Sequence, residues 1–161
     1  IIGLAEMFNA TSYAFTAENN EWYPLPFTNP GNENEPKLSQ NLQRIHEAIR
    51  EIKKEHSEVY LLGFSQGACM ALEYGTNQEV TGIIAFSGGL IGKEEELTKK
   101  TRTRNILICC SEKDPFIPLE RARKSTEIYK QNGSIVITNF YEGNTHAITK
   151  KDIELAQNMI N

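Results

Sequence analysis

The sequence predicts an α/β fold in which a mostly parallel sheet carries helices on both faces. Short apolar runs alternate with amphipathic helical segments along most of the chain, as in proteins built from strand–helix–strand units. In addition, residues 59–72 place an apolar run, a glycine-flanked serine and a helical pattern in direct succession. The length of 161 residues suits a single domain, so we expect one domain over residues 1–161.

The individual elements follow from local patterns. Strands are expected over 12–15, 59–62, 82–87, 106–110 and 134–141. Helices are expected over 1–9, 38–55, directly after the serine turn, 119–131 and 153–160. The helix over 38–55 has the clearest apolar stripe, which consists of Leu38, Leu42, Ile45, Ile49 and Ile52. Residues 93–100 suggest a solvated helical turn with ion pairs Glu95–Lys99 and Glu96–Lys100.

Residues 16–37 form a long polar segment that contains four prolines and the only tryptophan. A loop of this length inside a compact domain is usually functional or covers a site. One interpretation makes its aromatic residues a wall of a substrate pocket, and the other makes them a plug folded against the domain. For the pocket we expect Trp22, Leu25, Phe27, Phe64, Phe116 and Ile117.

The serine turn is the pentapeptide Gly63-Phe64-Ser65-Gln66-Gly67, a G-x-S-x-G motif between a strand and a helix. In that context the serine has a strained backbone, and we expect both glycines to give room that a Cβ would fill. The hydroxyl of Ser65 then lies beside a helix N-terminus, where the N–H of Gln66 can stabilise an oxyanion. The alternative is an ordinary Gly/Ser turn without chemistry.

A reactive serine needs a histidine base and a carboxylate that orients it. In the fold to which this motif belongs the chain order is Ser, Asp or Glu, then His. Of the three histidines only His146 follows Ser65, and Asp114 is the only aspartate between them. Both residues come just after predicted strands, where open α/β sheets gather their sites. The sequence therefore predicts a triad of Ser65, Asp114 and His146.

Alternatives remain for each of these residues. Taken alone, Asp114 is typical of a turn before proline, and His146 of a surface loop. Glu112 is a second candidate for the carboxylate, whereas Asp152 is better explained by a capping box that opens the last helix.

Composition limits the function further. A net charge of −4 argues against nucleic acid as the main partner. The sequence contains no apolar run of 18 residues, so no membrane span is predicted. The three cysteines occupy apolar contexts, so we expect buried free thiols in a reducing compartment and a cytoplasmic protein. None of the cysteines has metal-ligand spacing to a histidine, so no metal site is expected. The chemistry of the predicted triad needs neither a metal nor an organic cofactor.

Four segments together resemble the phospholipase/carboxylesterase family of small α/β-hydrolases, which includes acyl-protein thioesterase-like and dienelactone-hydrolase-like members. They are GFSQGA (residues 63–68), SEKDPFIP (111–118), GNTHAI (143–148), and a loop that contains ENNEWYPLPF (18–27) followed by NEP (34–36). The resemblance implies an α/β-hydrolase fold, with Ser65 as nucleophile, Asp114 as orienting acid and His146 as base. It further implies a carboxylesterase or lysophospholipase-like serine hydrolase that acts on small-molecule esters or thioesters of short to medium acyl chains.

The sequence departs from this family at its start. Such hydrolases carry a His-Gly-x-Gly loop that supplies a second oxyanion donor, and no such segment occurs in the 161 residues. We therefore expect the first strands and that loop to lie upstream of Ile1, and expect the open sheet edge to favour association into a homodimer. A non-catalytic protein or inactive fragment that retains the scaffold, or an acyltransferase on it, is the alternative.

Overall fold

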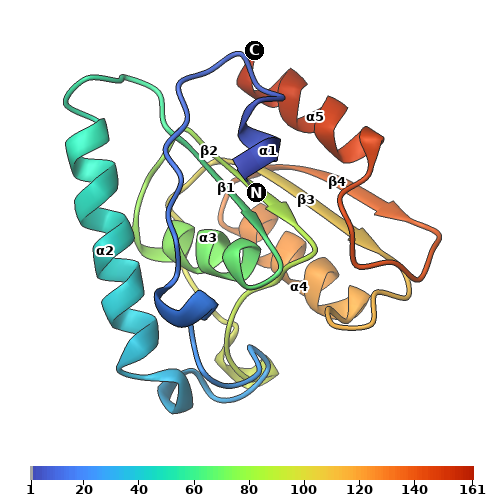
Figure 1. Ribbon diagram of the computed structural model, residues 1–161. Helices are drawn as coiled ribbons and strands as arrows, with labels where there is room; N and C mark the ends of the chain where they lie inside the picture. Colours follow the sequence, from blue (N-terminus) through green and yellow to red (C-terminus); the bar gives the residue numbers. More distant parts are fainter. Residues whose placement is uncertain (1) are drawn as a thin grey trace.

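The computed structural model describes residues 2–161, and within them a four-stranded parallel sheet forms the centre of the molecule (Figure 1). The strands follow the order of the chain across the sheet. They are β1 (Tyr60–Phe64), β2 (Gly82–Phe86), β3 (Asn105–Ser111) and β4 (Ile135–Tyr141). Because all four strands are parallel, their carboxyl ends meet at one edge of the sheet, where ligands bind in open α/β folds.

Helices cover both faces of this sheet, which confirms the predicted fold class. The first face carries α2 (Lys37–Ile52), α3 (Gln66–Asn77) and α4 (Leu119–Gln131), and the second carries α1 (Ile2–Ala5) and α5 (Lys150–Ile160). Short 3₁₀ turns lie in the connections: η1 (Glu18–Asn20), η2 (Gly31–Asn34) and η3 (Glu94–Glu96). Among the helices of residues 2–161, none combines the length and apolar character needed to cross a bilayer.

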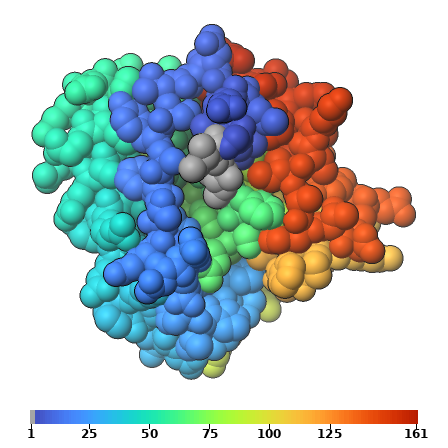
Figure 2. Space-filling view, in the orientation of Figure 1, coloured from blue at the N-terminus to red at the C-terminus, as the bar shows by residue number. Residues whose placement is uncertain are grey.

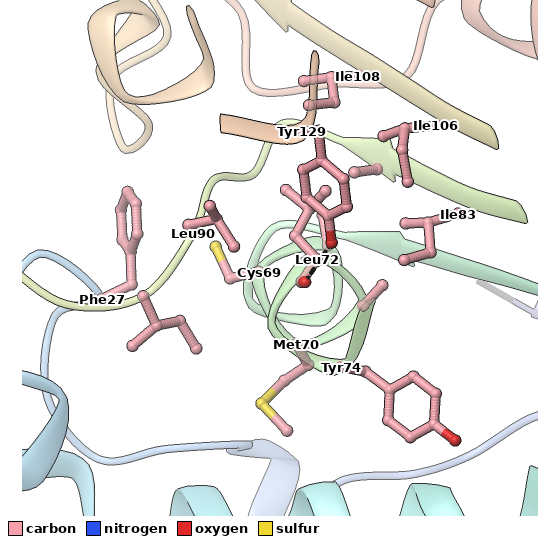
Figure 3. Close-up of a cluster of buried hydrophobic side chains, with 14 of the residues drawn as sticks. Phe27, Cys69, Met70, Leu72, Tyr74, Ile83, Leu90, Ile106, Ile108 and Tyr129 are labelled. Atoms are coloured by element: carbon pink, nitrogen blue, oxygen red, sulfur yellow. Dashed lines mark hydrogen bonds between the residues drawn. The ribbon is translucent and has the colours of Figure 1, made fainter. Parts of the chain in front are cut away.

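The central strands bury side chains on both faces, as their nearly continuous apolar sequences require. On the first face, Ile83 and Ile106 pack towards α3 and α4, where Leu72 and Tyr129 meet them (Figure 3). The hydroxyl of Tyr129 donates to the carbonyl oxygen of Leu72 at 2.6 Å, which satisfies the one polar atom of this fully buried ring. The second face buries Ile84, Phe86, Leu107 and Cys109 against α5.

The N-terminal segment differs from its prediction. Of the helix expected over 1–9, the described residues form only Ile2–Ala5, and Ile1 lies outside them. Residues 12–15 form no regular secondary structure and belong to no sheet, so the predicted strand is wrong. This segment crosses the molecule between α2 and α5 (Figure 2). A cavity of about 550 Å³ separates it from β1, which is one of the two edge strands of the sheet in residues 2–161.

The ion pairs predicted from sequence spacing in residues 93–100 are also wrong. The only regular structure there is the 3₁₀ turn η3, so the expected i,i+4 pairs do not form. Instead the ammonium of Lys99 reaches the nearly buried carboxylate of Glu73 at 2.6 Å and the carbonyl oxygen of Ile91 at 2.7 Å. Glu96 accepts hydrogen bonds from the backbone N–H groups of Gly31 and Lys93.

Candidate active site

Ser65 occupies the sharp turn between β1 and α3. Its φ of 55° and ψ of −123° lie in a region that costs a non-glycine residue strain, and such strain is concentrated at functional positions. The turn is held from both sides, because the Ser65 N–H donates to the carbonyl oxygen of Phe86 and the Ser65 carbonyl accepts from Ala68 and Cys69. The serine is thereby fixed at the carboxyl edge of the sheet.

The two glycines of the motif have different roles. A Cβ built on Gly63 would lie 2.2 Å from the carbonyl oxygen of Gly67, so β1 and α3 can approach this closely only with glycine there. For Gly67 the expected clash is wrong, since a Cβ would meet only the indole nitrogen of Trp22 at 3.8 Å, an ordinary contact. Gln66 is the first residue of α3, so its N–H has no acceptor within the helix.

Asp114 follows the end of β3, and its side chain is fully buried. One carboxylate oxygen accepts the backbone N–H groups of Phe116 at 2.9 Å and Ile117 at 3.0 Å. Burial raises the pKa of Asp114, but the hydrogen bonds from His146 and from these two N–H groups outweigh it, and the net pKa is lowered. The carboxylate is therefore held in its ionised form.

His146 contacts this carboxylate directly. Its Nδ1 lies 2.8 Å from Asp114 Oδ2 and 3.0 Å from Oδ1, a bifurcated hydrogen bond that requires a proton on Nδ1. The imidazole packs between two aromatic rings, with centroid distances of 4.7 Å to Phe64 and 4.9 Å to Phe116. Because Phe64 immediately precedes Ser65, the histidine–aspartate pair lies beside the serine turn.

The rival carboxylates lie elsewhere. Glu112 is exposed, and its backbone N–H joins the carbonyl oxygen of Tyr141. Asp152 is buried and accepts the Thr149 N–H and hydroxyl at 2.8 Å each, and the Thr149 hydroxyl accepts the Asp152 N–H in return. These bonds form the predicted capping box at the start of α5.

Several contacts that fix the His146 loop were not anticipated from the sequence. The hydroxyl of Ser111, the last residue of β3, donates to the carbonyl oxygen of Thr145 at 2.7 Å. The N–H of Lys113 donates to the Gly143 carbonyl oxygen at 2.9 Å. A hydroxyl residue ending a strand beside a site is a weak signal, whereas the partners, thirty or more residues away, leave no trace in the local sequence.

The six residues expected to line a pocket fall into different environments. Phe64 and Phe116 flank His146, and Phe116 is 67% exposed. Trp22 lines the cavity beside β1, and Leu25 is exposed. Phe27 and Ile117 belong to the buried core, with the Arg121 guanidinium 5.5 Å from the centre of the Phe27 ring, and their place in a pocket wall stays a prediction.

A parallel sheet with helices on both faces and a serine on a strained turn from a strand into a helix match the α/β-hydrolase fold. A family model described as Phospholipase/Carboxylesterase matches residues 9–161. The chain belongs to this family.

Individual relatives agree with that assignment. Among solved structures, the phospholipase/carboxylesterase from Dyadobacter fermentans DSM 18053 superposes with a TM-score of 0.81 at 35% identity, over 89% of this chain and 73% of that one. SOBER1 from Arabidopsis thaliana has a TM-score of 0.70 at 18% identity, over 86% and 71% of the two chains, and so shares the fold. Acyl-protein thioesterase 1 from Gibberella zeae is 29% identical over 103 residues, which cover 60% of this chain and 44% of that protein.

Proposed function

We propose that this protein is a serine hydrolase that cleaves carboxylic esters or thioesters through Ser65, His146 and Asp114. The observation that carries the proposal is the hydrogen bond from His146 Nδ1 to the buried Asp114 carboxylate, beside the residue that precedes Ser65. A proton held on Nδ1 leaves Nε2 with a lone pair, which is the form a general base needs.

In this mechanism the Ser65 hydroxyl attacks the acyl carbonyl while His146 Nε2 takes its proton. Asp114 holds the tautomer and stabilises the imidazolium that forms. The oxyanion is stabilised by the Gln66 N–H at the start of α3, where the helix dipole adds to the effect. His146 then protonates the alcohol or thiol as it leaves, and water repeats the sequence on the acyl-enzyme.

The family and the surface of the site support the proposed substrate class. The exposed Phe116 ring beside His146 favours an apolar group on the substrate. The matched thioesterase from Gibberella zeae, by its name, acts on acylated proteins, and this supports thioesters as well as oxygen esters of short to medium acyl chains here. Neither a metal nor an organic cofactor takes part in the proposed reaction.

The test compares the complete protein with Ser65→Ala in turnover of p-nitrophenyl acetate and butyrate. We expect the rate to fall about 10³-fold or more, because the covalent step is lost. Ser57→Ala, at an exposed serine, serves as the control and should leave the rate unchanged.

A fluorophosphonate probe provides a second readout, since it forms a covalent bond only with an activated hydroxyl. Labelling is expected in the parent and in Ser57→Ala but not in Ser65→Ala. An unlabelled parent would favour a scaffold without chemistry, and equal turnover by the parent and Ser65→Ala would end the proposal. A rate that rises on adding an alcohol, with transfer of the acyl group to it, would indicate acyl transfer instead.

A further inference from the structure

We propose that the side chain of Gln66 is a positioning residue for substrate selection: its carboxamide fixes the loop that carries Trp22, and the indole forms the wall against which the apolar group of the ester packs. The inference rests on the proposed function, because it takes Ser65 as the reacting residue. It assigns to Gln66 a second role besides the backbone N–H that faces the oxyanion.

Both ends of the Gln66 carboxamide bind the same dipeptide. Oε1 accepts the Trp22 N–H at 3.0 Å, and Nε2 donates to the Tyr23 carbonyl oxygen at 3.1 Å. Satisfying a donor and an acceptor together requires an amide, because a carboxylate has no donor and alanine offers neither group. The Gln66 carboxamide thus complements the backbone donor and acceptor of residues 22–23.

A second amide holds the same stretch from another helix. Asn41 of α2 is buried, and its Nδ2 donates to the Trp22 carbonyl oxygen at 2.7 Å. Its own Oδ1 accepts from Arg44 at 2.9 Å, which fixes which end of the amide faces the loop. Side chains from α2 and α3 therefore bind three backbone groups of residues 22–23, where the loop itself forms neither helix nor strand.

This clamp determines where the indole lies. Tyr23 is 2% exposed and anchors the loop in the core, while the half-buried Trp22 ring lies over the first turn of α3. The Trp22 indole nitrogen is 3.8 Å from the Cβ position of Gly67, two residues after Ser65. A displacement of about 1 Å in a group that positions substrate is enough to change rates substantially, so loss of the carboxamide should alter which esters are accepted.

The first experiment measures the indole directly in the complete protein. Gln66→Ala and Gln66→Glu should shift the Trp22 emission to longer wavelength and increase its quenching by acrylamide, because the ring is no longer held against α3. Subtracting the spectrum of Trp22→Phe assigns the signal to this residue. Gln40→Ala, at an exposed glutamine of α2, is the matched control and should leave the emission unchanged.

The second experiment separates positioning from catalysis. All Gln66 variants keep the backbone N–H, so for p-nitrophenyl octanoate we expect kcat/KM to fall roughly tenfold, mainly through KM, and by a larger factor than for the acetate. Asn41→Leu, which is remote from the reacting atoms, should reproduce this pattern. A series of acetate esters with longer alcohols then shows whether the wall faces the acyl or the alcohol group.

In these two experiments the inference would be overturned by an emission spectrum of Gln66→Ala that matches the parent, or by an equal loss of kcat for short and long esters. Binding of octanoate to Ser65→Ala, followed by Trp22 fluorescence, needs no chemistry at Ser65. It therefore tests the wall even if the proposed hydrolysis fails. Equal octanoate affinity of Ser65→Ala and of the double variant Ser65→Ala/Gln66→Ala would also contradict the inference.

Discussion

The carboxylate of Asp114 meets three donors: the imidazole of His146 and the N–H groups of Phe116 and Ile117. Such hydrogen bonds to an ionised group are about twice as strong as those between neutral groups. They explain how a buried carboxylate retains its charge, and they give it two separable effects, one on the histidine tautomer and one on stability.

The effect on the tautomer predicts the activity of Asp114→Asn. An asparagine oxygen can still accept the loop N–H groups, but its NH₂ would favour the histidine tautomer with the proton on Nε2. We expect kcat for p-nitrophenyl butyrate to fall by about 10⁴ while the fold persists. Steady-state kinetics beside a circular dichroism spectrum checks this; a loss under tenfold would contradict the role given to Asp114.

The Asp114 carboxylate also makes the stability of the parent depend on pH, and Asp114→Asn removes this contribution. Because the pKa of Asp114 is lowered in the folded protein, its charge stabilises the fold above the unfolded value of about 4, and this contribution disappears as the pH falls through the lower, folded pKa. Urea unfolding should therefore show the parent losing more stability than Asp114→Asn as the pH is lowered from about 5 to 2. If the free energies of unfolding of the parent and of Asp114→Asn changed with pH in parallel, the charge of Asp114 would not stabilise the fold.

At the scale of elements, the start of α5 connects stability to the site. The Asp152 carboxylate caps the helix through Thr149 and also accepts Nδ2 of Asn139 in β4 at 2.8 Å. The segment that carries His146 ends at this cap. The helix, the last strand and the histidine loop are thus joined through a single buried side chain.

Asp152→Ala keeps the N–H that Thr149 Oγ1 accepts, but it removes the reciprocal half of the capping box and leaves the Asn139 amide without its partner. The lost hydrogen bonds are made to a charged group and the Asn139 amide is half-buried, so we expect the free energy of unfolding to fall by roughly 1.5–3 kcal/mol. Urea denaturation measures this, with Glu154→Ala on the exposed side of α5 as the control. If both variants changed stability equally, the capping network would contribute nothing particular.

For the whole molecule, the three cysteines report on global opening. All are free and buried. Burial raises the pKa of Cys69 to about 11 and that of Cys110 to about 12, and it raises the pKa of Cys109 well above its usual value. Their thiolates are therefore scarce and shielded in the folded state.

We expect Ellman's reagent at pH 8 to react slowly with the folded protein and rapidly in urea. The reaction rate should follow the unfolded fraction, because these thiols become accessible only when the core opens. Measuring the release of the coloured thiolate against urea concentration checks this. Fast stoichiometric reaction of any one thiol in the absence of urea would show that part of the core opens locally.

Local patterns predicted the strands and helices of the sheet well. The helix α4 has its predicted bounds, because Asn132 and Gly133 end its pattern clearly. Features that depend on distant partners could not be predicted. Lys99 pairs with Glu73 across the fold, and residues 12–15 have strand-like composition but no ladder partner in the described part of the chain. The order of residues along the chain was enough to select His146 and Asp114 as candidates. The contacts that hold their loops could not be predicted, because they join residues far apart in the sequence.

The close approach at Gly63 has a consequence for how this scaffold can diversify. Since the backbones of β1 and α3 touch there, the helix cannot slide or tilt without pulling the strand with it. The Ser65 hydroxyl must therefore move with the sheet as one rigid unit, so we expect new substrate preferences to arise only from parts that are free to vary around it. A library built to retarget the enzyme should leave residues 63–67 intact and randomise the exposed ring at 116 and the loop around Leu25.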